Sequence, residues 1–362
     1  MNIGEPNEWK EIHLKPVILE TVARVSSRVF VGELCRDKKW IQTTIDYTVN
    51  FFIAATYLRM IPGPLRRICH WFVPQCREAR RQFDEARRVI APVIEKRRAL
   101  RAEAQSAGRP PPNFHDAIDW VDQEAVDRGV SFDPATFQLM LSVAAIHTTV
   151  DLCTEFILQL AANPQYFASI REEVVRILKA DGWTKGSLYN MKLLDSALKE
   201  SQRHKPPGVV VFRMGDPELY KEPEKWDPYR FLRMREQAET ETEALLVTTS
   251  PNHLAFGYAA FGYDLNPIKK PLLPGFVWNY FLDASTANFG FCRHGKHACP
   301  GRFFAATEIK IILCHLLIKY EWELAPGADI KPMALGFTNG VSPTAHILIR
   351  KRKVMEIDID SL

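Results

Sequence analysis

Several features that mark common classes of protein are missing from this sequence. Lysine and arginine number 47 and aspartate and glutamate 43, so the net charge is only +4. No basic patch interleaved with aromatic residues accompanies it, and we therefore expect no nucleic-acid partner. The first ten residues, MNIGEPNEWK, are polar and charged, so we expect neither a signal peptide nor a transmembrane anchor there.

The cysteines lack the pattern of a disulfide framework. There are seven of them, an odd number, and no pair recurs at a regular spacing. Such a set fits a reducing compartment better than a secreted, disulfide-bonded fold, so we expect an intracellular protein. No internal repeat is visible either, which argues against a solenoid.

What the sequence does contain is typical of a globular protein. A chain of 362 residues with 46% hydrophobic and 25% charged residues can bury a sizeable core, as one large domain or two ordinary ones. Apolar residues recur with helical periodicity in residues 17–30 and 40–58, and a charged helix with one apolar stripe is expected from residue 77 to about residue 105. A turn between strands is expected at residues 334–343 and a strand at 347–350. These patterns predict a mainly α fold with a small β component.

A central helix is predicted for residues 133–163. Asp133 is an N-cap residue and Pro134 suits the first helical position. The residues that follow are apolar almost all round, as in a buried helix. The polar residues His147, Thr148, Thr149 and Asp151 then interrupt this apolar run.

A cysteine at the start of a helix is the most informative feature of the C-terminal part. Residues 295–304 read GKHACPGRFF and lead into an apolar helical pattern. Pro300 suits a first helical turn, so the sulfur of Cys299 would face free amides and the positive end of the helix dipole, which favour the thiolate. Gly301 would let backbone approach a flat ligand, and the basic residues nearby would suit its carboxylates. A thiolate so placed can serve as the axial ligand of haem iron.

Two other interpretations of this cysteine compete with a haem ligand. Most single cysteines of intracellular proteins are small buried hydrophobic residues. Alternatively, Cys292, His294, His297 and Cys299 could be four zinc ligands, although their spacing is more compressed than in the usual zinc motifs.

The sequence GKHACPGRFFA resembles the haem-binding signature of the cytochrome P-450 superfamily, the haem-thiolate monooxygenases. It has the form found in filamentous-fungal members that oxidise terpenoid and indole-diterpene scaffolds. The resemblance implies haem b as the cofactor, with Cys299 as the axial ligand of the iron. It also implies further haem contacts from His297, Gly301 and Arg213.

Two other stretches carry the same resemblance. Residues 144–149, AAIHTT, are similar to the oxygen-activating motif of the family, in which Thr148 occupies the threonine position and His147 replaces the usual acid. Glu200, Arg203 and Arg230 match a glutamate and two arginines that brace the haem-binding core. The spacing of Glu200 and Arg203 is uninformative alone, because other Glu–Arg pairs in this chain repeat it.

The chain also departs from the family pattern. The N-terminal anchor, the first helices and the β-rich segment are expected to be missing, as is a hairpin between Pro207 and Glu218. Residues 259–294 are an atypical insertion before the haem-thiolate loop and the helix after it, residues 295–319. We therefore expect one partial domain, residues 1–362, with an incomplete cytochrome P-450 fold.

The resemblance implies a monooxygenase that inserts one oxygen atom from O2 into an apolar, terpenoid-type substrate in secondary metabolism. Electrons would come from NADPH through NADPH-cytochrome P-450 reductase. Full-length relatives reside in the endoplasmic reticulum membrane, and the apolar residues 51–71 suggest a peripheral membrane contact here. The alternative is a non-catalytic remnant that does not bind haem productively.

Overall fold

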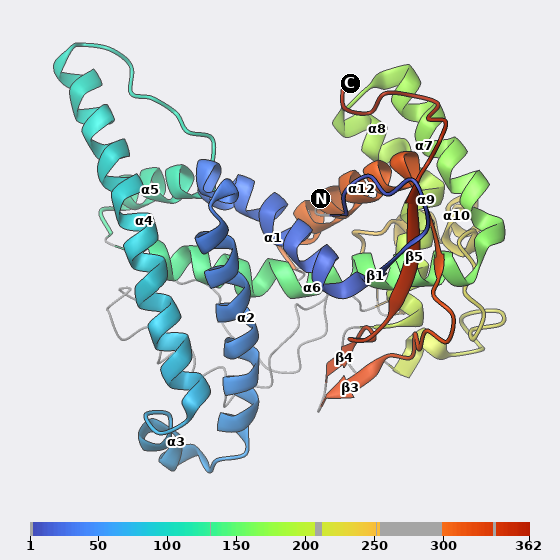
Figure 1. The fold of residues 1–362 in the computed structure, drawn as a ribbon, viewed down its shortest axis with the longest axis horizontal. Coiled ribbons are helices and arrows are strands. Elements are labelled where there is room, and N and C mark those ends of the chain that lie inside the picture. Colours follow the sequence, from blue (N-terminus) through green and yellow to red (C-terminus); the bar gives the residue numbers. More distant parts are fainter. Residues whose placement is uncertain (1–2, 131, 207–211, 251, 254–298, 336–337) are drawn as a thin grey trace. The chain divides into compact units, whose positions relative to one another are not determined.

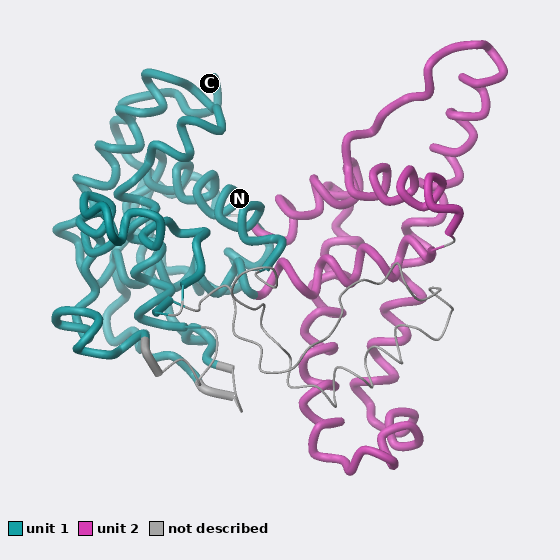
Figure 2. Tube along the Cα trace, turned by 180° about the vertical axis from the view of Figure 1, so that it is seen from behind, with its two compact units in different colours: residues 1–21, 148–258, 291–362 teal, residues 22–147, 259–290 magenta. Residues whose placement is uncertain are grey.

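The computed structural model describes residues 3–130, 132–206, 212–250, 252–253, 299–335 and 338–362 (Figure 1). The chain forms two compact units (Figure 2). Unit 1 comprises residues 1–21, 148–258 and 291–362, and unit 2 comprises residues 22–147 and 259–290. Helices α1 (Leu14–Val31) and α6 (Pro134–Ala162) contribute residues to both units.

The described part of unit 2 is helical. Its long antiparallel helices α2 and α4 are joined by the short helix α3 (Figure 1). The elements of this unit after α1 are η1 (Gly32–Arg36), α2 (Lys38–Arg59), α3 (Gly63–Cys69), α4 (Pro74–Ser106) and α5 (Ala117–Arg128).

Local signals explain where these helices begin. Asp37 caps α2 by accepting hydrogen bonds from the amides of Lys39 at 2.7 Å and Trp40 at 3.1 Å. Helix α4 starts at Pro74, and α6 starts at Pro134 as predicted. The predicted apolar stripe of α4 is confirmed, since its buried residues recur every three or four positions: Cys76, Ala79, Phe83, Ala86, Ile90, Ile94 and Arg97.

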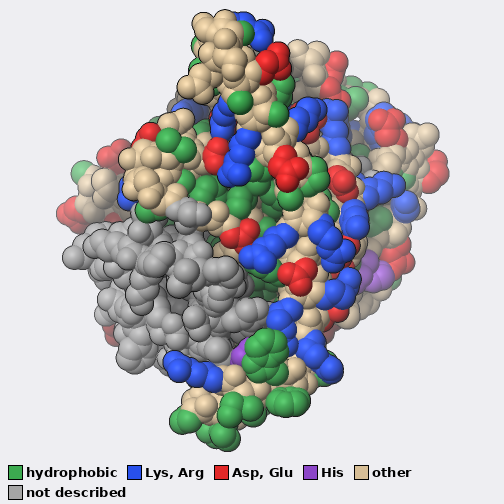
Figure 3. Space-filling model, turned by 90° about the vertical axis from the view of Figure 1, so that its left-hand side faces the viewer, with side chains coloured by type: hydrophobic (Ala, Val, Ile, Leu, Met, Phe, Trp, Pro, Cys, Tyr) green, Lys and Arg blue, Asp and Glu red, His purple; other side chains and the backbone are tan. Residues whose placement is uncertain are grey.

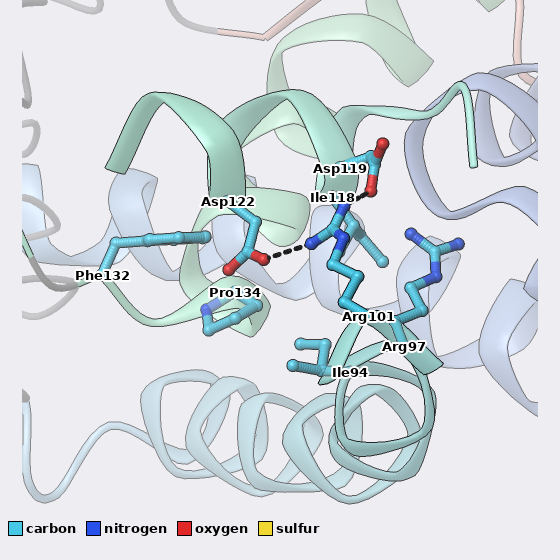
Figure 4. A pocket seen from close by; sticks show the side chains of 8 residues that line it. All are labelled: Ile94, Arg97, Arg101, Ile118, Asp119, Asp122, Phe132 and Pro134. Carbon is cyan, nitrogen blue, oxygen red and sulfur yellow. Dashed lines mark hydrogen bonds and ion pairs between the residues drawn. The ribbon is translucent and has the colours of Figure 1, made fainter. Parts of the chain in front are cut away.

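A ladder of arginines and aspartates joins α4 to α5. Arg97 forms a buried bidentate pair with Asp116, with distances of 2.8 and 2.5 Å, and Asp116 also caps α5. Arg101 pairs with Asp119 and Asp122 beside a cavity of about 10 Å³, which has room for a single water molecule (Figure 4). These charges neutralise one another, so the ion pairs serve to hold α4 and α5 together. The cavity beside them is too small for a substrate.

Unit 1 combines the second half of α6 with shorter helices and two small sheets. Lys192–His204 forms α9, the helix on which the unit's buried charges lie. The other helical elements are η2 (Pro164–Tyr166), α7 (Phe167–Asp181), α8 (Lys185–Asn190), η3 (Phe212–Gly215), α10 (Arg230–Arg235), η4 (Thr242–Ala244) and α12 (Arg302–Lys319).

The larger sheet joins the two ends of the described chain. Its order is β1 (Lys10–His13), β5 (His346–Lys351), β2 (Tyr320–Leu324), and both pairings are antiparallel. The sequence predicts β5 but gives no signal for β1, whose partner lies more than 300 residues away. A second sheet pairs β3 (Met333–Leu335) with β4 (Thr338–Gly340). A mainly α fold with a small β component is thus confirmed.

Helix α6 is, among the described residues, the one helix long and apolar enough to cross a membrane by length and composition. Within the most apolar part of this helix, 67% of the residues are buried inside the protein. Burial to this extent is equally expected of a helix in a protein core.

Candidate functional site

Cys299 lies three residues before α12, so the helix starts slightly later than the sequence predicts and Pro300 precedes the N-cap instead of lying in the first turn. Gly301 is the N-cap residue, and the helix runs on from Arg302. The carbonyl of Cys299 accepts a hydrogen bond from the Arg302 side chain at 2.7 Å, which orients the backbone of the cysteine. A Cβ atom added to Gly301 would lie 3.9 Å from the Sγ atom of Cys299, so the glycine leaves space beside the sulfur.

Three other described cysteines, Cys76, Cys153 and Cys314, are buried and less suited to bind a metal as thiolates. Burial raises the pKa of Cys76 to about 11 and of Cys314 to about 12, and it also raises the pKa of Cys153. Cys69 is partly exposed and is the last residue of α3. Cys35, three residues before α2, is partly exposed as well, so the sequence GKHACPGRFF around Cys299 is what distinguishes Cys299.

The oxygen-activating motif lies in the middle of α6. Thr148 is exposed, as is Ala144 one turn earlier, whereas Val143 and Ile146 are buried. The helix therefore presents a face of small side chains next to the threonine.

His147 connects α6 with α2. Its Nε2 atom lies 2.8 Å from the hydroxyl of Thr48, and its ring meets that of Phe52 edge to face. The Thr48 hydroxyl already donates to the carbonyl of Ile45 at 2.8 Å, so it accepts a hydrogen bond from His147. This contact holds the imidazole against α2.

Some predicted residues lie outside the described part of the chain. His297 belongs to residues 254–298, as do Cys292 and His294 of the alternative zinc set and the whole insertion at 259–294. Arg213 lies in η3, but its side chain is not among the described ones. The described residues contain no cluster of three or more histidine, cysteine or acidic residues suited to a metal ion.

Glu200, Arg203 and Arg230 come together in the interior of unit 1. The carboxylate of Glu200 is fully buried and accepts hydrogen bonds from Arg203 Nε at 2.8 Å and from Arg230 Nε at 3.0 Å. It also accepts from the amide of Asp227 at 3.2 Å. One carboxylate thus connects α9 with the residues around the start of α10.

The two guanidinium groups extend this network to backbone carbonyls. Glu222 has a positive φ of 50°, an uncommon value for a residue with a side chain, and its carbonyl accepts from Arg230 at 3.2 Å. The buried arginines therefore hold an irregular segment in one conformation. Their other carbonyl acceptors are Met214 and Pro223 for Arg203, and Lys221 and Lys225 for Arg230.

Sequence reasoning missed further buried charges on the same helix. The ammonium of Lys199 has no exposed surface and donates to the carbonyls of Leu245 at 2.7 Å and Thr248 at 3.0 Å. Asp195, one turn earlier, accepts from the amide of Leu246 at 2.9 Å. The i, i+4 spacing of Asp195 and Lys199 indicates that the two charges share one face of the helix. It does not indicate burial, because the same spacing is common on exposed helices.

Burial also controls the protonation of two groups in this region. It lowers the pKa of Lys199 to about 7, against the favourable charge of Asp195. Burial, together with the charges of Lys199 and Arg203, holds the pKa of His253 well below its ordinary value. His253 is therefore neutral, and its ring packs edge to face on Phe231.

Comparisons with known proteins identify the family. The sequence model of cytochrome P-450 matches residues 2–214 and 281–348, more than half of the chain. The chain belongs to the cytochrome P-450 family. Cytochrome P-450 monooxygenase hepE of Aspergillus oryzae is 40% identical over 376 residues, which cover 96% of this chain. Cytochrome P-450 monooxygenase 2 of Gibberella fujikuroi is 41% identical over 374 residues, which cover 95% of it.

The solved structure of retinoic acid bound cyanobacterial CYP120A1 has the same fold. It matches with a TM-score of 0.58 at 16% identity, covering 96% of this chain and 71% of that one. This cytochrome P-450 chain spans 62% of the length of hepE and 70% of the length of monooxygenase 2.

Replacing Glu200 by Gln should destabilise the cytochrome P-450 core strongly. The change leaves the buried guanidinium groups of Arg203 and Arg230 without their carboxylate, and loss of one partner of a buried ion pair costs about 3–5 kcal/mol. Chemical denaturation measures this as a loss in the free energy of unfolding. The matched control is Glu78→Gln, which removes the same i, i+3 spacing to Arg81 at an exposed site and should cost less than about 1 kcal/mol. Equal losses in the two variants would contradict the assignment.

Lys199 should make stability depend on pH above neutrality. Its pKa is about 7 in the folded chain and near 10.5 in the unfolded chain, so the unfolded chain binds more protons between these values. The free energy of unfolding should therefore rise with pH across this window, by on the order of a few kcal/mol. Urea unfolding of the native chain and of Lys199→Met at a series of pH values measures the difference. Parallel pH profiles would show that Lys199 does not titrate in this range.

Proposed function

We propose that this chain belongs to a haem-dependent monooxygenase, which inserts one oxygen atom from O2 into a C–H bond of an apolar, terpenoid-type substrate. The observation that carries the proposal is Cys299, a partly exposed thiol three residues before α12 in a chain of the cytochrome P-450 family. The terpenoid class rests on the resemblance to fungal enzymes of secondary metabolism.

The described residues fit haem b at this position. The sulfur of Cys299 has the donor chemistry that haem iron requires of a thiolate ligand, and Gly301 places no side-chain atom beside this sulfur. When bound, haem supplies a redox-active iron whose reactivity toward dioxygen depends on the axial thiolate. His297 and Arg213 are assigned to the propionates, where cationic donors bind carboxylates most strongly.

Residues of α6 are assigned to oxygen activation. Thr148 offers a hydroxyl on an exposed face of the helix, beside the small side chain of Ala144. A hydroxyl both donates and accepts hydrogen bonds, so Thr148 would hold a water molecule and a proton at its Oγ1 atom. His147 donates to Thr48, so we assign it to holding α6 in place and, as a second role, to the proton relay.

The proposed reaction needs a source of electrons. NADPH would supply them through NADPH-cytochrome P-450 reductase, and the endoplasmic reticulum membrane would be the site of the reaction. The alternative is a remnant that no longer binds haem, which the same experiment separates from an enzyme.

The carbon monoxide difference spectrum of the dithionite-reduced protein tests the proposal. We expect a red-shifted, thiolate-type Soret band from the native chain and none from Cys299→Ser. Cys69→Ser, which removes another partly exposed thiol, should leave the band intact. A colourless native chain, or a band of the neutral-ligand type that Cys299→Ser does not change, would favour the remnant.

We also propose a peripheral membrane contact through the tip of unit 2, at α3. Five large apolar side chains are more than half exposed there, and they gather at the lower edge of Figure 3. Arg67 and Arg77 are exposed beside them and suit anionic lipid headgroups. Arg80 stacks on the ring of Trp71 at 4.5 Å, which holds this aromatic side chain at the surface. The five are Met60, Leu65, Ile68, Trp71 and Phe72.

Co-sedimentation with vesicles tests this contact. The double variant Ile68→Ser/Phe72→Ser should reduce the fraction bound to phosphatidylcholine–phosphatidylserine vesicles by more than about tenfold. The reason is that two apolar side chains that would insert into the bilayer are replaced by polar ones. The control Trp120→Ser/Val126→Ser changes two exposed apolar residues of α5 and should bind as the native chain does. Equal binding by all three proteins would refute a contact at α3.

A further inference from the structure

Asp195 is a buried carboxylate that connects four segments of unit 1. It lies in α9 with 6% of its surface exposed. One oxygen forms an ion pair with Lys310 of α12 at 2.5 Å, and the other binds Arg235 of α10 and the amide of Leu246 at 2.9 Å. The helix that follows Cys299 is thus joined to α9 through a charge pair.

Lys310 lies in the middle of α12, and its side chain is buried in the protein. Lys310 is 5% exposed, and its ammonium also donates to the carbonyl of Leu188 in α8 at 2.9 Å. The pair acts about 12 Å along the helix axis from Arg302, the first residue of the helix. Because a helix moves nearly as a rigid rod, a shift at Lys310 carries over to Arg302, whose side chain donates to the carbonyl of Cys299 at 2.7 Å.

Loss of the carboxylate would leave two buried cations facing each other. Asp195 forms an ion pair with both Lys310 and Arg235, whereas the partly buried carboxylate of Glu173 in α7 acts on Lys310 through its charge and forms no described ion pair with it. Uncompensated charges in the interior repel and draw in water, so the segments that carry them separate. The expected movement takes α12 away from α10 and weakens the contact of α12 with α9.

The glutamate of the neighbouring network does not duplicate this role. Glu200 accepts from Arg203, Arg230 and the amide of Asp227, and these described hydrogen bonds do not reach α12. At the other end of α12, Arg171 of α7 donates to the carbonyl of Leu317 at 2.7 Å. Asp195 therefore anchors the middle of the helix separately.

We propose that Asp195 is a positioning residue for the thiolate: through Lys310 it sets the place of α12 and hence of the Cys299 sulfur. This inference rests on the proposed function in one respect, that Cys299 ligates haem. The position of α12 itself can be measured without haem.

The first measurement uses the haem-loaded protein and the variant Asp195→Asn. Its reduced carbon monoxide spectrum should shift from the thiolate-type band toward the neutral-ligand band, with the thiolate-type share reduced by about tenfold at equal haem content. A role in stability alone would lower the total haem bound but leave the ratio of the two bands unchanged. An unchanged ratio would overturn the proposal.

The second measurement is hydrogen–deuterium exchange on the haem-free chain. Exchange in the first turns of α12 should accelerate by about tenfold in Asp195→Asn, since the helix loses its central anchor. Lys310→Met should accelerate it less, because Arg235 then keeps its partner, and Lys310→Arg should restore the native rate. Native exchange rates in Asp195→Asn would overturn the proposal even if no haem binds.

A matched control removes another ion pair of the same helix. Asp360 pairs with Lys319 at 2.6 Å at the C-terminal end of α12, and the Asp360 side chain is 64% exposed. Asp360→Asn should change neither the band ratio nor the exchange of the first turns. If Asp360→Asn had the same effect as Asp195→Asn, any loss of charge along α12 would suffice and Asp195 would have no special role.

Discussion

The described part of unit 1 depends on one electrostatic constraint, which is that charges buried on α9 must be neutralised where they lie. Asp195, Lys199, Glu200 and Arg203 occupy consecutive turns of this helix and are all nearly inaccessible. A buried charge is costly unless partners and hydrogen bonds surround it. Two segments therefore present backbone groups to this helix: Met214, Pro223 and Asp227 to Arg203 and Glu200, and Leu245, Leu246 and Thr248 to Lys199 and Asp195. The conformation of both segments follows from the helix beside them.

Local signals in the sequence predict much of the helical framework. Pro134 begins α6, and the stripe of α4 follows from apolar residues at helical spacing. Strand β1 could not be predicted in this way, because its residues are mostly polar and it forms only against β5. Long-range pairing of this kind leaves no trace in the local pattern.

The candidate site likewise contains one part that local sequence signals predict and one part that they do not. The helix start beside Cys299 is visible in the sequence, because proline and glycine have local conformational preferences. The ion pairs of α9 are not, since Glu78 and Arg81 have the same spacing as Glu200 and Arg203 but lie at the surface. Whether such a pair is buried depends on segments that are distant in sequence. Only the resemblance to a known family could distinguish the two pairs beforehand.

The order of the strands in the larger sheet has a consequence for biosynthesis. Strand β1 leaves the ribosome well before its partner β5, which follows more than 300 residues later. Helices α2, α4 and α5 can pack as soon as they are made, because their partners are close in sequence. Residues 10–13 must therefore wait unpaired until residues 346–349 have been made. The polar residues Lys10 and Glu11 in that strand help to keep it soluble during this wait.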